Sequence, residues 1–179
     1  MYHNHTAQTR LVITGIPHQK EAVRLLLHTL QFSGKKIDFI TSFGNNAENN
    51  DFILFEAETS QLLEYQPNLV LITGIVDVEL YQKFLETVVS GGIVIYKGDD
   101  IPLAQLVENS ENYFRKIPFS NPETEVSGGT LYLRTDMGEI PLQTSVAENI
   151  AYVDGVKHLA QQLGIMEEEF YESLMDFKF

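Results

Sequence analysis

The sequence contains no cysteine and no long apolar run, and both absences exclude classes of protein. Without cysteine, the 179-residue chain can form neither disulfide bonds nor thiolate metal sites. Its apolar runs are all shorter than the roughly 20 residues that a helix needs to cross a bilayer. The sequence also shows no charged and then apolar export signal. We therefore expect a soluble, cytoplasmic protein.

Basic residues are scarce. Twelve lysines and arginines stand against twenty-five aspartates and glutamates, which gives a formal charge of −13. Such a charge repels nucleic acid and anionic lipid, so we expect neither as a partner. An anionic ligand would need a local positive site, for which the candidates are Lys20, Arg24, Lys35, Lys36 and Lys97. A solvated acidic surface without a binding role explains most of the imbalance.

Length and composition favour one globular domain. The chain is 44% hydrophobic and 21% charged, which is ordinary for a globular protein, and it is long enough to bury a sizeable core. The polar residues 1–9 include His3 and His5, but two histidines alone do not complete a metal site. We expect a flexible tail over residues 1–9 and a single domain over residues 10–179.

A strand, a tight turn and a helix are predicted for residues 11–30. Residues 11–13 form a short apolar run, residues 14–17 break it, and a helix is expected from Pro17 onward. Apolar residues recur there at helical spacing, namely Val23, Leu26, Leu27 and Leu30. A unit of this kind presents the free amides of a helix N-terminus to a phosphate. It lacks a phosphate loop's second glycine and lysine–hydroxyl pair, because His18, Gln19 and Lys20 follow the turn.

The remaining pattern alternates strands and helices. Strands are expected at 36–43, 52–55, 69–72, 93–96 and 113–119, with helices near 78–88 and 102–107. Residues 44–50 and 121–129 are expected to be loops, and 130–143 a hairpin. Helices should follow at about 150–163 and 167–177. We predict an α/β fold with a mainly parallel, P-loop-like sheet flanked by helices, and a small antiparallel hairpin in the C-terminal third.

A candidate site lies where the predicted parallel strands end. Ligands of such sheets bind beyond the carboxyl ends of the strands. The residues expected there are Gly15, Glu56, Glu58, Gly74, Asp77, Lys97 and Asp99. The carboxylates of Glu56, Glu58, Asp77 and Glu79 could gather at adjacent strand ends. Oxygen ligands of that kind suit magnesium or calcium, and mutually repelling surface carboxylates are the alternative interpretation.

Five segments in order give the chain a resemblance to a known family. They read ITGIPHQKEA, FEAETS, ITGIVDVEL, KGDDIP and AENIAYVDGVKHLAQQLGI. Over residues 9–179 the chain resembles the central, ATP-binding domain of the Mur ligases, most closely the branch of UDP-N-acetylmuramate–peptide ligases. The resemblance leaves no counterpart for the family's N-terminal UDP-sugar domain or its C-terminal amino-acid domain. If the family activity persists, it implies ATP and Mg²⁺ as cofactors.

The resemblance assigns candidate nucleotide-binding residues. Gly15 matches the first glycine of the family's phosphate loop, while His18 stands at the second glycine and Gln19 at the lysine. Lys20 lies one position later, where the family has a hydroxyl for magnesium. Asn149 matches an asparagine that lies near the adenine, although a helix-start role is equally open. A loop with these replacements is expected to bind triphosphate poorly.

The resemblance also assigns candidate metal ligands. Glu56 matches the family's metal-binding glutamate, and Glu58 matches the next acidic position. Glu79 stands where the family has a histidine, and Gly74 stands where it has an asparagine. Asp99 and Asp100, followed by Pro102, resemble the family's NADDP segment with one residue inserted. Helix capping by aspartate accounts for these two residues equally well.

Three functional hypotheses remain open. The first is a degenerate Mur-ligase-like pseudoenzyme that binds a nucleotide, a UDP-muramyl-type cell-wall intermediate or another protein. The second is an ATP-dependent amide-forming ligase subunit of peptidoglycan synthesis or recycling, with Lys20 replacing the usual lysine. The third is a purely structural protein-interaction domain whose acidic face meets a basic protein.

Overall fold

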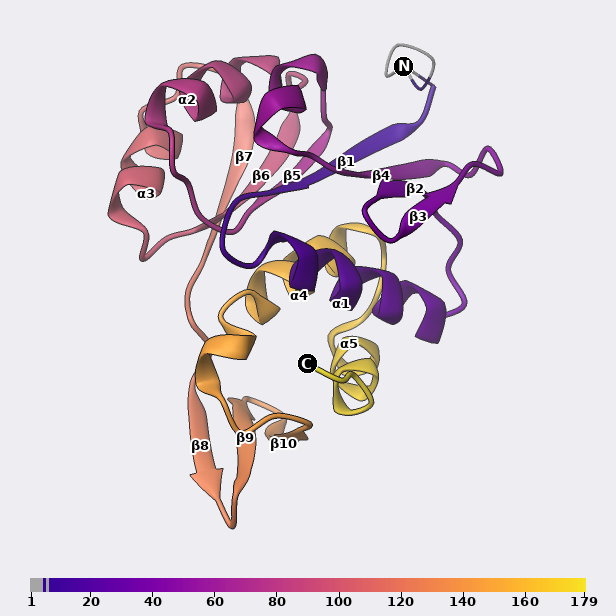
Figure 1. Cartoon of the computed structure of the whole chain (residues 1–179), viewed down its shortest axis with the longest axis vertical. Helices are drawn as coiled ribbons and strands as arrows, with labels where there is room; N and C mark the ends of the chain where they lie inside the picture. The colour runs from indigo at the N-terminus through magenta and orange to yellow at the C-terminus, as the bar shows by residue number, and fades with distance from the viewer. Residues whose placement is uncertain (1–4, 6) are drawn as a thin grey trace.

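The computed structural model describes residue 5 and residues 7–179, and its centre is a seven-stranded sheet (Figure 1). The strands, in the order β3-β2-β4-β1-β5-β6-β7, are β1 (Thr9–Thr14), β2 (Asp38–Thr41), β3 (Gly44–Asn46), β4 (Phe52–Glu56), β5 (Leu69–Ile72), β6 (Gly92–Lys97) and β7 (Phe114–Phe119). Neighbouring strands are parallel except for β2 and β3, which are antiparallel. The predicted α/β class and mainly parallel sheet are confirmed.

Helices cover both faces of this sheet (Figure 1). They are α1 (Gln19–Phe32), α2 (Val78–Thr87), α3 (Ile101–Glu108), α4 (Val153–Gln162) and α5 (Glu167–Met175), with 3-10 turns η2 (Thr59–Glu64) and η3 (Ala147–Ile150). One core packs α1, α4 and α5 against the sheet through residues such as Leu25, Val156 and Phe170. The other packs α2 and α3 through residues such as Phe84 and Leu103. In the described part of the chain, no helix has the length and apolar character of a membrane-spanning segment.

The first helix begins later than predicted. Helix α1 starts at Gln19, with His18 at the N-cap position, and Pro17 lies in the turn before it. The chain uses residues 15–17 to leave the end of β1, so the proline is not part of the first helical turn. The apolar face predicted for α1 is correct, since Val23, Leu26 and Leu30 are buried.

A separate three-stranded antiparallel sheet lies in the C-terminal third (Figure 1). Its strands are β8 (Thr124–Ser127), β9 (Thr130–Thr135) and β10 (Gly138–Leu142). The predicted hairpin of β9 and β10 is confirmed. The loops predicted at 121–129 and 44–50 are wrong in part, because β8 and β3 form within them. Both are short, largely exposed edge strands that lack the apolar alternation typical of a strand.

The structure describes only part of the predicted N-terminal tail. Residues 1–4 and 6, including His3, lie outside the described residues. Thr9 is the first residue of β1, and Gln8 donates a hydrogen bond to Asp38. Residues 8 and 9 thus contact the domain, and the flexibility of the tail over residues 1–9 stays a prediction.

A buried carboxylate fixes the segment between β3 and β4. Asp38 is 1% exposed and accepts hydrogen bonds from the backbone N–H groups of Glu48, Asn49 and Asn50 at 2.9, 3.1 and 3.3 Å. The side chains of Asn50 and Gln8 add two more, at 2.7 and 2.8 Å. Burial alone would raise the pKa of Asp38, but these donors outweigh it and lower the pKa below its usual value of 3.8.

We expect Asp38→Asn to lower the free energy of unfolding by about 2 to 3 kcal/mol, because the amide N–H₂ faces donors that need an acceptor. The loss should be complete above pH 3.8 and should shrink as the pH falls through the lower pKa of the folded state, where the wild-type carboxyl is itself protonated. Urea denaturation at several pH values measures this. Asp51→Asn, at an exposed residue, is the control. Equal losses in the two variants would contradict the role of Asp38.

Candidate functional site

The loop that leaves β1 is pressed against the end of β5. Gly15 has a φ of +109°, and a Cβ atom placed on it would lie 2.4 Å from the carbonyl oxygen of Gly74. A Cβ atom placed on Gly74 would lie 2.4 Å from the carbonyl oxygen of Ile16. Neither position has room for a side chain. The asparagine that the resemblance would place at position 74 is therefore excluded with the loop as it lies here.

Hydrogen bonds hold the strand ends beneath this loop. The backbone N–H of Thr73 donates to the carbonyl of Thr14 at 3.0 Å. The buried hydroxyl of Tyr81, from α2, lies 3.0 Å from the Thr14 hydroxyl. Burial raises the pKa of Tyr81, so its hydroxyl stays protonated at neutral pH. The end of β1 is thus fixed both to β5 and to α2.

His18 lies at the point where the resemblance requires a glycine. Its backbone has a φ of −102°, a conformation open to any residue, and its half-buried ring lies 5.5 Å from the ring of Tyr152, at an angle of 34°. Burial lowers the pKa of His18, the positive charge of Lys97 lowers it further, and Glu21 partly opposes both effects. The imidazole is therefore neutral at pH 7 and fills space rather than supplying positive charge.

The lysines near this end of the sheet supply less positive charge than their number suggests. Gln19 and Lys20 form the start of α1, and Lys20 is exposed. Lys97, at the end of β6, has its ammonium nitrogen 3.9 Å from a carboxylate oxygen of Asp99. Part of its charge is therefore neutralised within the protein.

One of the three carboxylates predicted as metal ligands has a contact within the protein, and the other two are exposed. Glu56 accepts a hydrogen bond from the backbone N–H of Ser42 at 2.6 Å. Glu58 is an exposed residue at the start of η2, and Glu79 is exposed in the first turn of α2. Among the described residues, no group of three histidine or carboxylate side chains is arranged to hold a metal ion. The residues as placed do not form a ready magnesium site, and the assignment stays a prediction.

Two further strand-end aspartates act as helix caps. Asp77 accepts from the backbone N–H of Leu80 at 3.0 Å, at the start of α2. Asp100 accepts from Leu103 at 3.1 Å, at the start of α3. The second oxygen of Asp100 would lie 3.7 Å from a Cβ atom on Gly74, so this carboxylate lies near the end of β5.

Asn149 lies on η3, three residues before the Tyr152 ring that contacts His18. The segment carrying Asn149 therefore lies beside the loop after β1, and its assignment as a nucleotide-binding residue stays a prediction. Its amide donates to the hydroxyl of Thr144, five residues earlier, at 3.1 Å. Asn149 does not cap a helix here, because the N-cap residues of η3 and α4 are Val146 and Tyr152.

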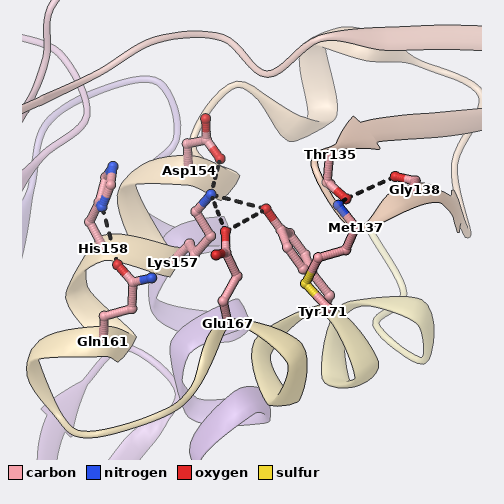
Figure 2. Close-up of polar contacts among 9 residues, drawn as sticks. All are labelled: Thr135, Met137, Gly138, Asp154, Lys157, His158, Gln161, Glu167 and Tyr171. Atoms are coloured by element: carbon pink, nitrogen blue, oxygen red, sulfur yellow. Dashed lines mark hydrogen bonds and ion pairs between the residues drawn. The ribbon is translucent and has the colours of Figure 1, made fainter.

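A second polar cluster, missed by the sequence reasoning, joins α4 to α5 (Figure 2). The ammonium of Lys157 lies 3.4 Å from Asp154, 3.0 Å from Glu167 and 3.0 Å from the hydroxyl of Tyr171. Burial opposes the charged form, but the bond to Tyr171 and the two carboxylates raise the pKa of Lys157 overall. The cluster is partly buried and links the two helices. The spacing of Asp154 and Lys157 on one helix face was the available sequence signal.

We expect Gly74→Ala to reduce the free energy of unfolding by about 2 to 3 kcal/mol, since the new methyl group overlaps the Ile16 carbonyl and must displace the loop. Chemical denaturation measures the loss. Gly98→Ala is the matched control, because its nearest new contact is the Pro118 Cβ atom at 3.1 Å and its cost should be smaller. A Gly74→Ala protein as stable as the control would show that the loop moves freely.

We expect Lys97→Met to raise the pKa of His18 toward 6.5, because it removes the nearby positive charge while leaving the ring half-buried. The lowered pKa makes the wild-type protein more stable as pH rises from the folded-state pKa to 6.5, since the unfolded state binds more protons in that interval. The variant should show a smaller rise. NMR titration of the imidazole measures the pKa, with Lys36→Met as the control. An unchanged pKa would remove Lys97 as a cause.

Comparisons with known proteins identify the fold. No protein-family model and no curated protein matches the chain. Among solved structures, the murein peptide ligase of Psychrobacter arcticus matches with a TM-score of 0.75 at 11% identity, over 96% of this chain and 47% of the ligase. The UDP-N-acetylmuramoylalanyl-D-glutamyl-2,6-diaminopimelate–D-alanyl-D-alanyl ligase of Acinetobacter baumannii gives 0.76 at 12% identity, over 98% and 47%. A pseudomurein peptide ligase type C from Methanothermus fervidus gives 0.66 at 15% identity, over 96% and 50%.

The chain therefore spans about half the length of these ligases, while nearly all of its own length takes part in the match. Identities of 11 to 15% support a shared fold and leave activity aside. The sequence motifs, the order of the strands and these matches agree. The chain has the fold of the central domain of the Mur ligases.

Proposed function

We propose that this protein is a Mur-ligase-like middle domain that binds a partner protein and does not turn over ATP. The observation that carries the proposal is the loop after β1, which is packed onto Gly74. A phosphate cradle needs backbone N–H groups that converge on an open space. Here a carbonyl oxygen, that of Ile16, faces the end of β5, and Pro17 has no N–H to offer.

Electrostatics at this edge supports the same proposal. A triphosphate at the loop would approach the carboxylates of Asp100 and Glu21, while Lys97 already has Asp99 as a partner. His18 adds no positive charge at neutral pH, because burial and Lys97 lower its pKa. A UDP-muramyl ligand is anionic as well and meets the same repulsion. Of the ligands considered, a protein partner fits a chain of charge −13 best.

The ligase-subunit alternative depends on Lys20. This lysine lies in the first turn of α1 and is exposed, so its flexible ammonium is the group that could meet a phosphate. Ligation also needs magnesium and two acceptor substrates held in register, for which Glu56, Asp77 and Asp100 are committed to other contacts. The alternative therefore predicts that nucleotide binding requires Lys20.

Isothermal titration with ATP and Mg²⁺ tests the proposal. We expect no binding tighter than about 1 mM, which corresponds to roughly −4 kcal/mol, and no phosphate release. Lys20→Ala should behave as the wild type, and thermal unfolding confirms that both proteins are folded. Micromolar binding with hydrolysis that disappears in Lys20→Ala would contradict the proposal and establish the ligase-subunit alternative.

A further inference from the structure

Helices α2 and α3 lie on the face of the sheet opposite to α1, α4 and α5 (Figure 1). A groove lies between these two helices. Its volume is about 910 Å³. The residues that line it come from the facing sides of the two helices and from the segment that follows α3. The apolar ones are Val78, Leu85, Pro102 and Leu106.

The floor of this groove is fixed by hydrogen bonds. The side-chain amide of Asn112 donates to the carbonyl oxygens of Leu85 and Val88, each at 2.8 Å, and so closes the C-terminal end of α2. Asp77 and Asp100 cap the other ends of the two helices. Helix α2 is therefore fixed by side-chain hydrogen bonds at both ends, and helix α3 at its N-terminal end.

The groove combines exposed apolar surface with negative charge. Among the lining residues Val78 is 48% exposed and Leu85 is 1% exposed; Ile101, which is 61% exposed, adjoins the groove at Pro102 without lining it. Glu86 and Glu111 are exposed carboxylates among its lining, and none of the described residues that line it is a lysine or an arginine. An anionic ligand is repelled here, whereas a cationic one that also carries aliphatic side chains is attracted.

We propose that this groove docks an amphipathic helix of a partner protein, with aliphatic residues on one side and lysine or arginine on its flanks. This inference rests on the proposed function and names the surface and the partner. Helices α2 and α3 have 10 and 8 residues and so extend for about 15 and 12 Å. That length matches two to three turns of a docked helix, anchored by residues at i, i+3 or i+4, and i+7.

The experiment uses the full chain and a synthetic helix of about 14 residues with leucines at i, i+3 and i+7 and lysines at the flanking positions. Fluorescence anisotropy measures its binding. We expect saturable binding that weakens as salt increases. A peptide with glutamate in place of lysine, and one with the same composition in scrambled order, should each bind at least about tenfold more weakly.

Matched variants locate the binding. Glu86→Lys with Glu111→Lys should weaken binding of the lysine peptide at least about tenfold. Glu168→Lys with Glu172→Lys changes the net charge equally on the exposed side of α5 and should leave the affinity within about twofold. In the same way Val78→Ser should weaken binding, while Val126→Ser, at the 61%-exposed Val126 of β8, should not. Equal losses on both faces would overturn the inference, because they indicate unspecific attraction to an acidic protein.

Two readouts keep this inference apart from the proposed function. Titration with ATP and Mg²⁺ in the presence of the lysine peptide reports the strand-end site, and the anisotropy reports the groove. Absence of peptide binding, or equal binding of the scrambled peptide, overturns the groove inference and leaves the proposed function intact. Micromolar ATP binding with hydrolysis overturns the proposed function, whatever the peptide does.

Discussion

The backbone contact between the ends of β1 and β5 determines what this edge of the sheet can do. Gly15 and Gly74 approach so closely that a Cβ atom on either one would lie 2.4 Å from a carbonyl oxygen. A side chain at either position would have to displace this backbone. The contact also connects two positions far apart in the chain, since the loop can lie as it does only while residue 74 has no side chain.

The consequences of that contact extend to the surrounding charges. With the loop packed down, His18 is held against Tyr152, and burial together with Lys97 keeps its pKa low. Two strand-end carboxylates also have partners within the protein, a backbone N–H in the case of Glu56 and the start of α2 in the case of Asp77. Glu58, Glu79 and Lys20 are exposed.

The sequence predicts the strands and helices better than the candidate site, because the two depend on different kinds of contact. Strands β4 and β5 are continuous apolar runs buried on both faces, and α1 shows apolar residues at helical spacing, so local pattern is enough. Strands β3 and β8 pair through polar, exposed residues, which carry no such pattern. The Gly15 to Gly74 approach and the packing of His18 on Tyr152 join residues distant in sequence, so only the folded structure shows them.

The hydrophobic cores on the two faces of the sheet explain how the fold can form without an open phosphate loop after β1. The core on the α1, α4 and α5 face and the core on the α2 and α3 face are built from buried apolar side chains that do not include the loop at 15–18. Replacing His18 by glycine would remove one obstruction and leave the Ile16 carbonyl over Gly74. The arrangement of this edge therefore depends on several residues together, whereas most of the packing that stabilises the fold lies in the two cores. A domain of this kind can keep these cores, and the groove between α2 and α3, independently of what its strand ends bind.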